Sequence, residues 1–180
     1  MASFTTNDKQ ASSKATDGSG RASDRSSGGA VAGRRVCTFE EEGARYAIDV
    51  TLVGEVLVVE RVVGVALAPT AVLGVFNCRG TPIPLIDLGV TLGLRPVAPA
   101  LEEGATATAL MVHRGALQVG IRVQRVEAVV DAEQLLPGDE RVDRHIEGLL
   151  ESEDASVPPV QVLSTKFLLH RLRALRMRAQ

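Results

Sequence analysis

Few side chains in this sequence are of the kinds that bind metals. The three histidines, His113, His145 and His170, each lack a second His or Cys two to four residues away. The two cysteines, Cys37 and Cys78, lie far apart and form no CxxC pair. Because zinc sites draw on closely spaced Cys and His ligands, the sequence predicts no zinc site. We expect a protein without a metal or other cofactor.

Catalytic side chains are equally scarce. The chain contains no GxxxxGK[ST], GxGxxG or GxSxG motif, so no phosphate-binding loop or nucleophile elbow is predicted. Cys78 precedes Arg79, and a nearby guanidinium can lower the pKa of a thiol and activate it. The alternative is a strand residue that packs inward, which we favour. The sequence predicts a protein that is not an enzyme.

Composition sets the size and kind of core. The chain has 180 residues, of which 45% are hydrophobic, enough for one domain or two small lobes. Only 3% are aromatic and Trp is absent, which disfavours nucleic-acid modules that stack bases on aromatic side chains. No stretch approaches the roughly 18 uninterrupted apolar residues of a membrane helix, and no signal peptide is visible. We therefore expect a cytoplasmic protein.

Charge is unevenly distributed. Residues 127–154 contain ten acidic side chains against Arg141 and Arg144, whereas the stretch after Ser164 contains only basic ones. The two segments could form a partner surface, or they could be the solvated faces of ordinary elements.

The order of elements predicts a mainly β protein. Residues 1–33 include seven Ser and five Gly, so we predict a disordered arm. Short β-type runs separated by turn residues then alternate with few helices, which indicates a barrel or sandwich. The halves at about 36–94 and 106–163 are predicted to be two similar lobes, followed by a helix over about 164–177.

Three local features refine this prediction. The spacing of Val50, Val53 and Val56 predicts a short helix after Asp49, followed by a strand over 57–63. Asp87 is predicted to cap a one-turn helix over 88–92. Pro82 and Pro84 lack N–H donors and should lie at a sheet edge or bulge.

The stretch 73–88, LGVFNCRGTPIPLIDL, resembles the signature of the CheW-like domain family. Its central NCRG matches an NxRG motif. The segments YAIDV at 46–50 and VGEV at 53–56, and GIRV at 120–123 and PVQVL at 159–163, resemble further family segments in the same order. The resemblance covers about residues 36–172.

The resemblance implies two five-stranded SH3-like β-barrel lobes that share a core and carry no cofactor. It also implies a non-catalytic adaptor that couples the signalling tip of a methyl-accepting chemoreceptor to the regulatory domain of a CheA-type histidine kinase. By position, the residues implied to bind the receptor are Val50, Val53, Glu55, Asn77 and Arg79.

Other motif positions are expected to be structural. Gly74 and Gly80 lie in the signature strand and its turn, and Asp87 is expected to act as a helix cap. Arg79 presents a planar donor fork, and we expect it to make a bidentate pair with Glu55 on the preceding helix. An alternative role for Arg79 is to hold the turn without contacting a partner.

The second half departs from the family pattern. Gln124 and Ser164 stand where Asp is usual, and Pro158 and Pro159 remove ladder donors, so the last strand should be short or irregular. These departures leave open an alternative function: an accessory protein that binds the receptor but couples poorly, or not at all, to the kinase.

We predict that deleting residues 1–33 leaves the thermal midpoint unchanged within a few degrees, because this segment has too little apolar content to pack on a domain. Thermal unfolding of the full and shortened chains, followed by circular dichroism, tests this. A large drop in the midpoint would mean that the segment packs on the folded part.

Overall fold

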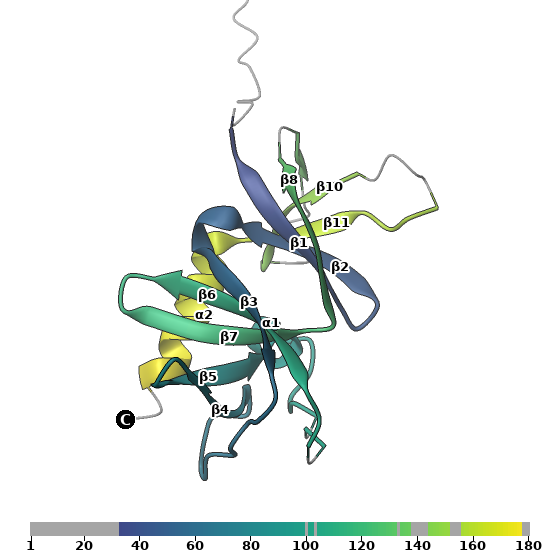
Figure 1. The fold of residues 1–180 in the computed structure, drawn as a ribbon. Coiled ribbons are helices and arrows are strands. Elements are labelled where there is room, and N and C mark those ends of the chain that lie inside the picture. The colour runs from purple at the N-terminus through teal and green to yellow at the C-terminus, as the bar shows by residue number, and fades with distance from the viewer. Residues whose placement is uncertain are drawn as a thin grey trace, which may run out of the picture.

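The computed structural model describes residues 33–99, 101–102, 104–132, 134–137, 144–151 and 156–177, which form a mainly β protein (Figure 1). Its strands make two sheets, one in the order β8-β1-β2-β11-β10-β9 and one in the order β3-β6-β7-β5-β4. We call them the six-stranded and the five-stranded sheet. The proposed arm, apart from Gly33, lies outside the described residues.

The bounds of the elements follow the predicted β-type runs closely. The six-stranded sheet contains β1 (Arg35–Glu41), β2 (Ala44–Asp49), β8 (Arg125–Asp131), β9 (Leu136–Pro137), β10 (Ile146–Leu150) and β11 (Val160–Leu163). The five-stranded sheet contains β3 (Val53–Val59), β4 (Val72–Cys78), β5 (Thr81–Asp87), β6 (Ala107–Arg114) and β7 (Leu117–Val123). The helices are η1 (Val50–Leu52), α1 (Leu88–Leu92) and α2 (Thr165–Met177).

The division of the chain between the sheets differs from the two consecutive halves expected from sequence. β2 pairs in parallel with β11, where Val162 lies opposite Ala47, so the second strand of the chain and the last one lie side by side (Figure 1). β7 pairs in parallel with β5, where Gly120 lies opposite Leu85. Each predicted half therefore contributes to both sheets. The six strands of the first sheet, rather than five, include the two-residue β9.

The short helix predicted after Asp49 is present only as one 3-10 turn, capped by the Asp49 carboxylate, which accepts the Thr51 N–H at 2.9 Å. The 3-10 helix η1 ends at Leu52, and β3 begins at Val53. From there exposure alternates with a period of two residues, as expected for a strand. The spacing of three residues between the valines is helical, and in a strand it places Val53 and Val56 on opposite faces. Pairing of β3 with β6 overrides this local pattern. β3 ends at Val59 rather than extending to Val63.

Val63 brings the two ends of the five-stranded sheet together. β3 and β4 lie at opposite ends of the strand order. Beyond β3, the Val63 N–H donates to the Val75 carbonyl, and the Val75 N–H donates to the Val63 carbonyl, both at 2.8 Å. This bridge connects the chain after β3 to β4, so the sheet curves towards a closed barrel and its edge is covered there.

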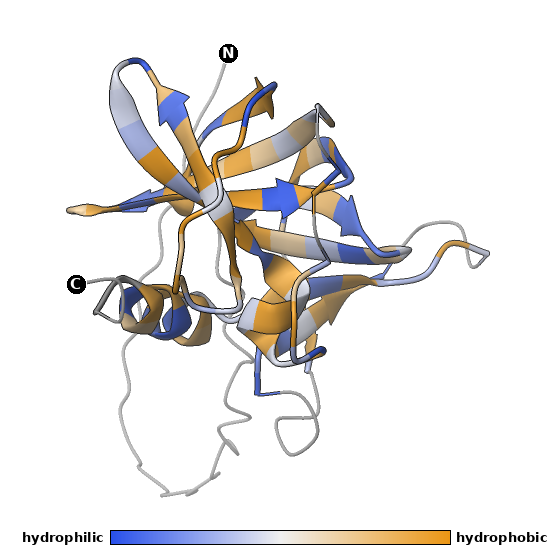
Figure 2. Ribbon diagram, turned by 90° about the horizontal axis from the view of Figure 1, so that it is seen from below, coloured by the Kyte–Doolittle hydropathy of each residue, from blue (hydrophilic) through white to orange (hydrophobic). Residues whose placement is uncertain are grey.

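Side chains from both sheets meet in one shared core. Phe39 and Ile48 of the six-stranded sheet pack with Leu110 and Ile121 of the five-stranded sheet and with Leu172 of α2, all at most 1% exposed. In Figure 2 hydrophobic and hydrophilic residues alternate along many strands. Each sheet also has a smaller apolar cluster of its own. The cluster on the five-stranded sheet includes Phe76 and Leu85, and the cluster on the six-stranded sheet includes Val36 and Val162.

A two-residue turn joins β4 to β5 and carries Arg79. Cys78 lies opposite Thr81, and the two residues between them have positive φ angles, 50° at Arg79 and 85° at Gly80. Positive φ at both central positions is the type I′ turn that matches the strand twist. Glycine takes this conformation freely, but an arginine there is strained. The turn places the Arg79 side chain at the tip of a hairpin.

Gly74 is required where Val63 bridges to β4. Its φ is 155°, and a Cβ there would lie 2.5 Å from Val62 Cγ1 and 2.6 Å from the Val63 carbonyl oxygen. The second contact is with backbone that is itself hydrogen-bonded to Val75. A side chain at this position would therefore push the bridge apart.

We predict that Gly74→Ala lowers the free energy of unfolding by roughly 1–3 kcal/mol, because the bridge must shift to admit the methyl group. Gly64→Ala is the matched control, since a Cβ at Gly64 would meet nothing within 4 Å. Urea denaturation of both variants gives the comparison. Equal stability of the two variants would contradict the role assigned to Gly74.

Candidate functional site

The surface around the β4–β5 hairpin combines an exposed cation with apolar side chains. A hollow of about 430 Å³ lies between the end of β3 and β4, and Val58, Val63, Asn77, Cys78 and Arg79 are among its lining residues. Val58 is 71% exposed and Val63 60%. We call these five residues and the space they line the hairpin hollow.

Glu55 and Arg79 form the ion pair expected from sequence, but in a different setting. Arg79 Nη2 lies 2.7 Å from Glu55 Oε2 in a single contact, not a bidentate one. Glu55 lies on β3, so the pair connects a strand to the hairpin turn and not a helix to a sheet. The Arg79 side chain is 79% exposed, and ion pairs this exposed stabilise a fold by at most about 1 kcal/mol.

The remaining nitrogens of Arg79 make no hydrogen bond to any residue within the part of the chain that the structure describes. A strained turn residue with a solvent-exposed donor fork contributes little to folding. Such a fork can bind a carboxylate or carbonyl groups on another molecule. The geometry therefore suits Arg79 to contact a partner while Glu55 orients its side chain.

The structure groups only some of the predicted receptor-binding residues. Glu55, Asn77 and Arg79 gather at the hairpin hollow. Val50 lies in η1 and Val53 begins β3; both are half-buried, and neither lines the hollow. Val53 packs against the shared core instead.

Sequence reasoning missed the apolar part of the hollow. Val58 was assigned only to a strand, and Val63 to the end of that strand. The visible signal was the unbroken apolar run of β3 from Val56 to Val59: a strand with apolar side chains on both faces must expose one of them unless both are covered.

Cys78 also lines the hairpin hollow and is half-buried, and Cys37 is buried in the core. Burial raises the pKa of the Cys37 thiol, as expected for an inert core cysteine. The described residues hold no group of three or more His, Cys, Asp or Glu side chains arranged to bind a metal ion.

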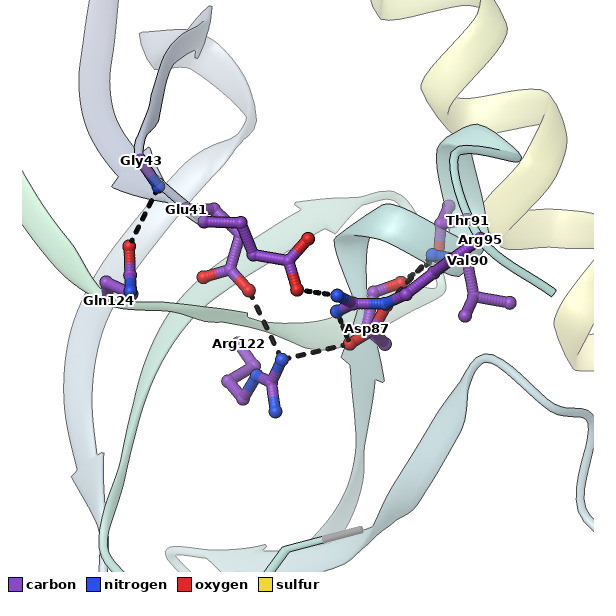
Figure 3. Close-up of polar contacts among 9 residues, drawn as sticks. Glu41, Gly43, Asp87, Val90, Thr91, Arg95, Arg122 and Gln124 are labelled. Atoms are coloured by element: carbon purple, nitrogen blue, oxygen red, sulfur yellow. Dashed lines mark hydrogen bonds and ion pairs between the residues drawn. The ribbon is translucent and has the colours of Figure 1, made fainter. Parts of the chain in front are cut away.

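A buried ionic cluster lies where the two sheets meet (Figure 3). Asp87 is fully buried and accepts hydrogen bonds from Arg95 Nη2 at 2.5 Å and Arg122 Nη2 at 3.1 Å. Its Oδ1 also accepts the Val90 N–H at 2.8 Å, which caps α1. Arg122 Nη2 also donates a hydrogen bond to Glu41 Oε1 on β1, at 3.3 Å. We call Glu41, Asp87, Arg95 and Arg122 the Asp87 cluster.

The Asp87 cluster joins both sheets to α1. Glu41 belongs to the six-stranded sheet, whereas Asp87 and Arg122 belong to the five-stranded sheet. Arg95, after α1, also pairs with Glu42 in the β1–β2 turn. A buried carboxylate without partners would be costly, so the two guanidinium groups must stay in place.

Glu41 is the least satisfied member of the cluster. Its Oε2 is buried and has no hydrogen-bond partner among the described residues. Burial raises the pKa of the Glu41 carboxyl above its ordinary 4.5, although Arg122 acts in the opposite direction. The folded protein therefore binds a proton at Glu41 more tightly than the unfolded chain does.

We predict that Glu41 makes the fold less stable as pH rises through its raised pKa, since burying the charged form costs more than burying the neutral acid. Glu41→Gln cannot titrate. The difference in unfolding free energy, wild type minus variant, should therefore increase as pH falls from about 8 to about 5. Denaturant unfolding across this range, with exposed Glu102→Gln as control, measures it. A difference that is independent of pH would contradict the prediction.

No helix in the described residues combines the length and apolarity that crossing a membrane requires. The second-half departures are accommodated locally. The Gln124 side-chain oxygen accepts the Gly43 N–H at 3.4 Å, and Ser164 Oγ accepts the Phe167 N–H at 3.4 Å at the start of α2. β11 begins at Val160, directly after the two prolines, and is four residues long, so the prediction of a short last strand is confirmed.

Comparison with known proteins finds CheW proteins both by sequence and by structure. The chemotaxis protein CheW of Klebsiella aerogenes is 31% identical over 114 residues, which cover 62% of this chain and 66% of that protein. This chain thus spans slightly less than two thirds of that relative. The crystal structure of the scaffolding protein TtCheW from Thermoanaerobacter tengcongensis has a TM-score of 0.60 at 21% identity, over 75% of this chain and 91% of that one, and it shows the same fold.

The match to a family model extends over nearly all of the described fold. A family model, the CheW-like domain, matches residues 35–173, from the first strand into α2. That range includes the hairpin hollow and the Asp87 cluster. The chain therefore belongs to the CheW-like domain family.

Proposed function

We propose that this protein is a cytoplasmic, non-catalytic adaptor of a bacterial chemosensory complex, which couples a methyl-accepting receptor to a CheA-type histidine kinase. The observation that carries the proposal is the β4–β5 hairpin, which presents the family's NxRG arginine on a strained turn beside an exposed apolar hollow. The chemotaxis protein CheW of Klebsiella aerogenes, which is similar in sequence, supports this proposal.

The chemistry of the hairpin hollow suits a helical partner such as a receptor tip. Val58 and Val63 offer apolar surface that the apolar face of an amphipathic helix can cover. Arg79 supplies a fork for a carboxylate or for the exposed carbonyls at a helix end. Glu55 holds that fork at the rim. Recognition thus combines burial of apolar surface with one charge-assisted contact.

Arg79→Ala should weaken binding of a receptor fragment by one to two decades, because a charge-assisted hydrogen bond contributes about 1.5–3 kcal/mol. The thermal midpoint should change little, since the Glu55 pair is exposed. Isothermal titration of the fragment into the folded variant measures the loss.

Two further variants separate the partner role of Arg79 from a turn role. Arg79→Asn places a residue at the tip that favours positive φ, so it should fold at least as stably as the wild type and still bind weakly. Arg114→Ala, at the exposed end of β6, controls for loss of one positive charge. Full affinity in Arg79→Asn would reduce Arg79 to a turn residue.

Kinase coupling is tested by reconstitution of purified receptor fragment, kinase and this protein. A coupler should form a stoichiometric ternary complex and raise autophosphorylation. We expect this result because the residues that depart from the family pattern, Gln124 and Ser164, still make hydrogen bonds that support the second half of the fold. Complex size and phosphorylation are followed in the same samples. Receptor binding without kinase activation would replace the coupler with the accessory function.

A further inference from the structure

The turn between β1 and β2 connects the two sheets through three consecutive residues. Each of them contacts a residue that lies in β7, directly after β7, or after α1. The pairs are Glu41 with Arg122, Glu42 with Arg95, and the Gly43 N–H with the Gln124 side chain. Figure 3 shows the contacts of Glu41 and Gly43. We call this turn and its three contacts the β1–β2 clasp.

The backbone of the clasp is strained. Glu41 lies opposite Ala44 in the ladder of β1 and β2, so two residues form the loop, and their φ angles are 53° at Glu42 and 75° at Gly43. Glycine adopts a positive φ freely, whereas a glutamate does so at a cost in free energy. The contacts across the sheet interface therefore contribute to keeping the turn in this position.

Glu41 is the buried member of the clasp, with 4% of its surface exposed. Its Oε1 shares the Arg122 Nη2 nitrogen with Asp87 Oδ2, at 3.3 Å and 3.1 Å respectively. Its Oε2 is also buried and receives no hydrogen bond from the described part of the chain. Asp87, by contrast, accepts further hydrogen bonds from Arg95 and from the Val90 N–H. A charged Glu41 is therefore less well satisfied than Asp87 next to it.

Charged groups from three other parts of the fold face Glu41. Arg122 of β7 and Arg95 after α1 favour its charged form, whereas Asp87 of β5 opposes it. In its own turn, Glu42 is paired with Arg95. Burial has the largest effect, and the balance raises the pKa of the Glu41 carboxyl. The docked turn therefore binds this proton more tightly than a turn that has moved away and lets the carboxylate reach water.

We propose that the β1–β2 clasp opens and closes with the protonation of Glu41. The turn stays docked on the other sheet while Glu41 is neutral, and loss of the proton favours a locally open state in which the carboxylate is hydrated. Local openings require less free energy than global unfolding, and they occur where few contacts hold a segment. The proton acts as the ligand that selects between the two states. This inference goes beyond the adaptor function and does not depend on it.

Amide hydrogen exchange of the full chain, followed by NMR between about pH 5 and pH 8, tests the proposal. The Gln124 N–H reports opening, because it donates to the Glu40 carbonyl next to the clasp, at 2.9 Å. After correction for the intrinsic pH dependence of exchange, the open fraction should rise with pH, by at most about tenfold per pH unit, since one proton is released. It should level off once Glu41 is charged in the docked state.

The buried Leu168 N–H, which donates to the Ser164 carbonyl in α2 at 2.9 Å, is the internal reference. It should stay more protected than the Gln124 N–H at every pH, because local opening of the clasp leaves α2 in place. Equal open fractions at the two amides would show global unfolding and overturn the proposal.

Two variants make the result specific. Glu41→Gln cannot titrate, so the open fraction at Gln124 should no longer depend on pH. Glu42→Gln removes the neighbouring acid, whose side chain is 52% exposed, and should keep the pH dependence of the wild type. A wild-type open fraction that is independent of pH, an unchanged pH dependence in Glu41→Gln, or its loss in Glu42→Gln would each contradict the proposal.

A direct titration of the Glu41 carboxyl by carbon NMR uses the wild type alone, so it does not depend on the folding of a variant. Its midpoint should lie above the ordinary 4.5 and should coincide with the pH at which the open fraction at Gln124 levels off. A midpoint at or below 4.5, or one unrelated to the exchange profile, would overturn the proposal.

Discussion

Asp87 is a fully buried carboxylate at the point where the two sheets and α1 meet, and the arrangement of the fold depends on keeping it paired. A buried carboxylate is tolerated only when charged partners and hydrogen-bond donors surround it. Here Arg95 and Arg122 supply the charge, and the Val90 N–H supplies a third donor. Since these partners come from different elements, movement of any of them would leave the carboxylate exposed to solvent or buried without a partner.

The Asp87 cluster is also connected to β1, to α2 and, through β5, to the hairpin that carries Arg79. Arg122 continues to Glu41 on β1, which ties the six-stranded sheet to the five-stranded one. Helix α1 is held by Asp87 and contacts α2 through Arg171, whose Nε donates to the Thr91 carbonyl at 2.9 Å. β5 ends at Asp87 and begins at the hairpin turn. The strand next to Arg79 is thus anchored at its far end in the Asp87 cluster, whereas the Arg79 side chain itself makes, among the described residues, only an exposed ion pair with Glu55.

Local features of the fold could be predicted from sequence because each depends on neighbouring residues. The cap of α1 by Asp87, the left-handed Gly93 after it and the start of the last helix follow from residue type and spacing. The motif at residues 73–88 also indicated the family and the pairing of Arg79 with Glu55. The residues that determine each of these features are close together in the sequence or belong to one motif.

Long-range pairing was beyond the reach of the same reasoning. Nothing local to Asp87 indicates Arg122, which joins it only because β5 and β7 pair in parallel. The exchange of strands between the two halves, through β2 with β11, has the same origin. For residues 50–56, the local spacing of the valines is helical, but tertiary pairing with β6 overrides it and forms a strand from Val53 on. The apolar run of β3 was visible in the sequence, but which of its valines are exposed follows only from the face of β3 that the fold leaves without a neighbour.

Amide hydrogen exchange in an Asp87→Asn variant tests most directly whether this one carboxylate fixes both sheets. Asn keeps the size of the side chain and can still accept the Val90 N–H, but it removes the charge that holds Arg95 and Arg122. The account predicts faster exchange in α1, β5 and β7 and also in β1 and β2 across the sheet interface, with β10 and β11 little changed. Faster exchange confined to α1 would contradict it, because Asp87 would then be a helix cap and nothing more.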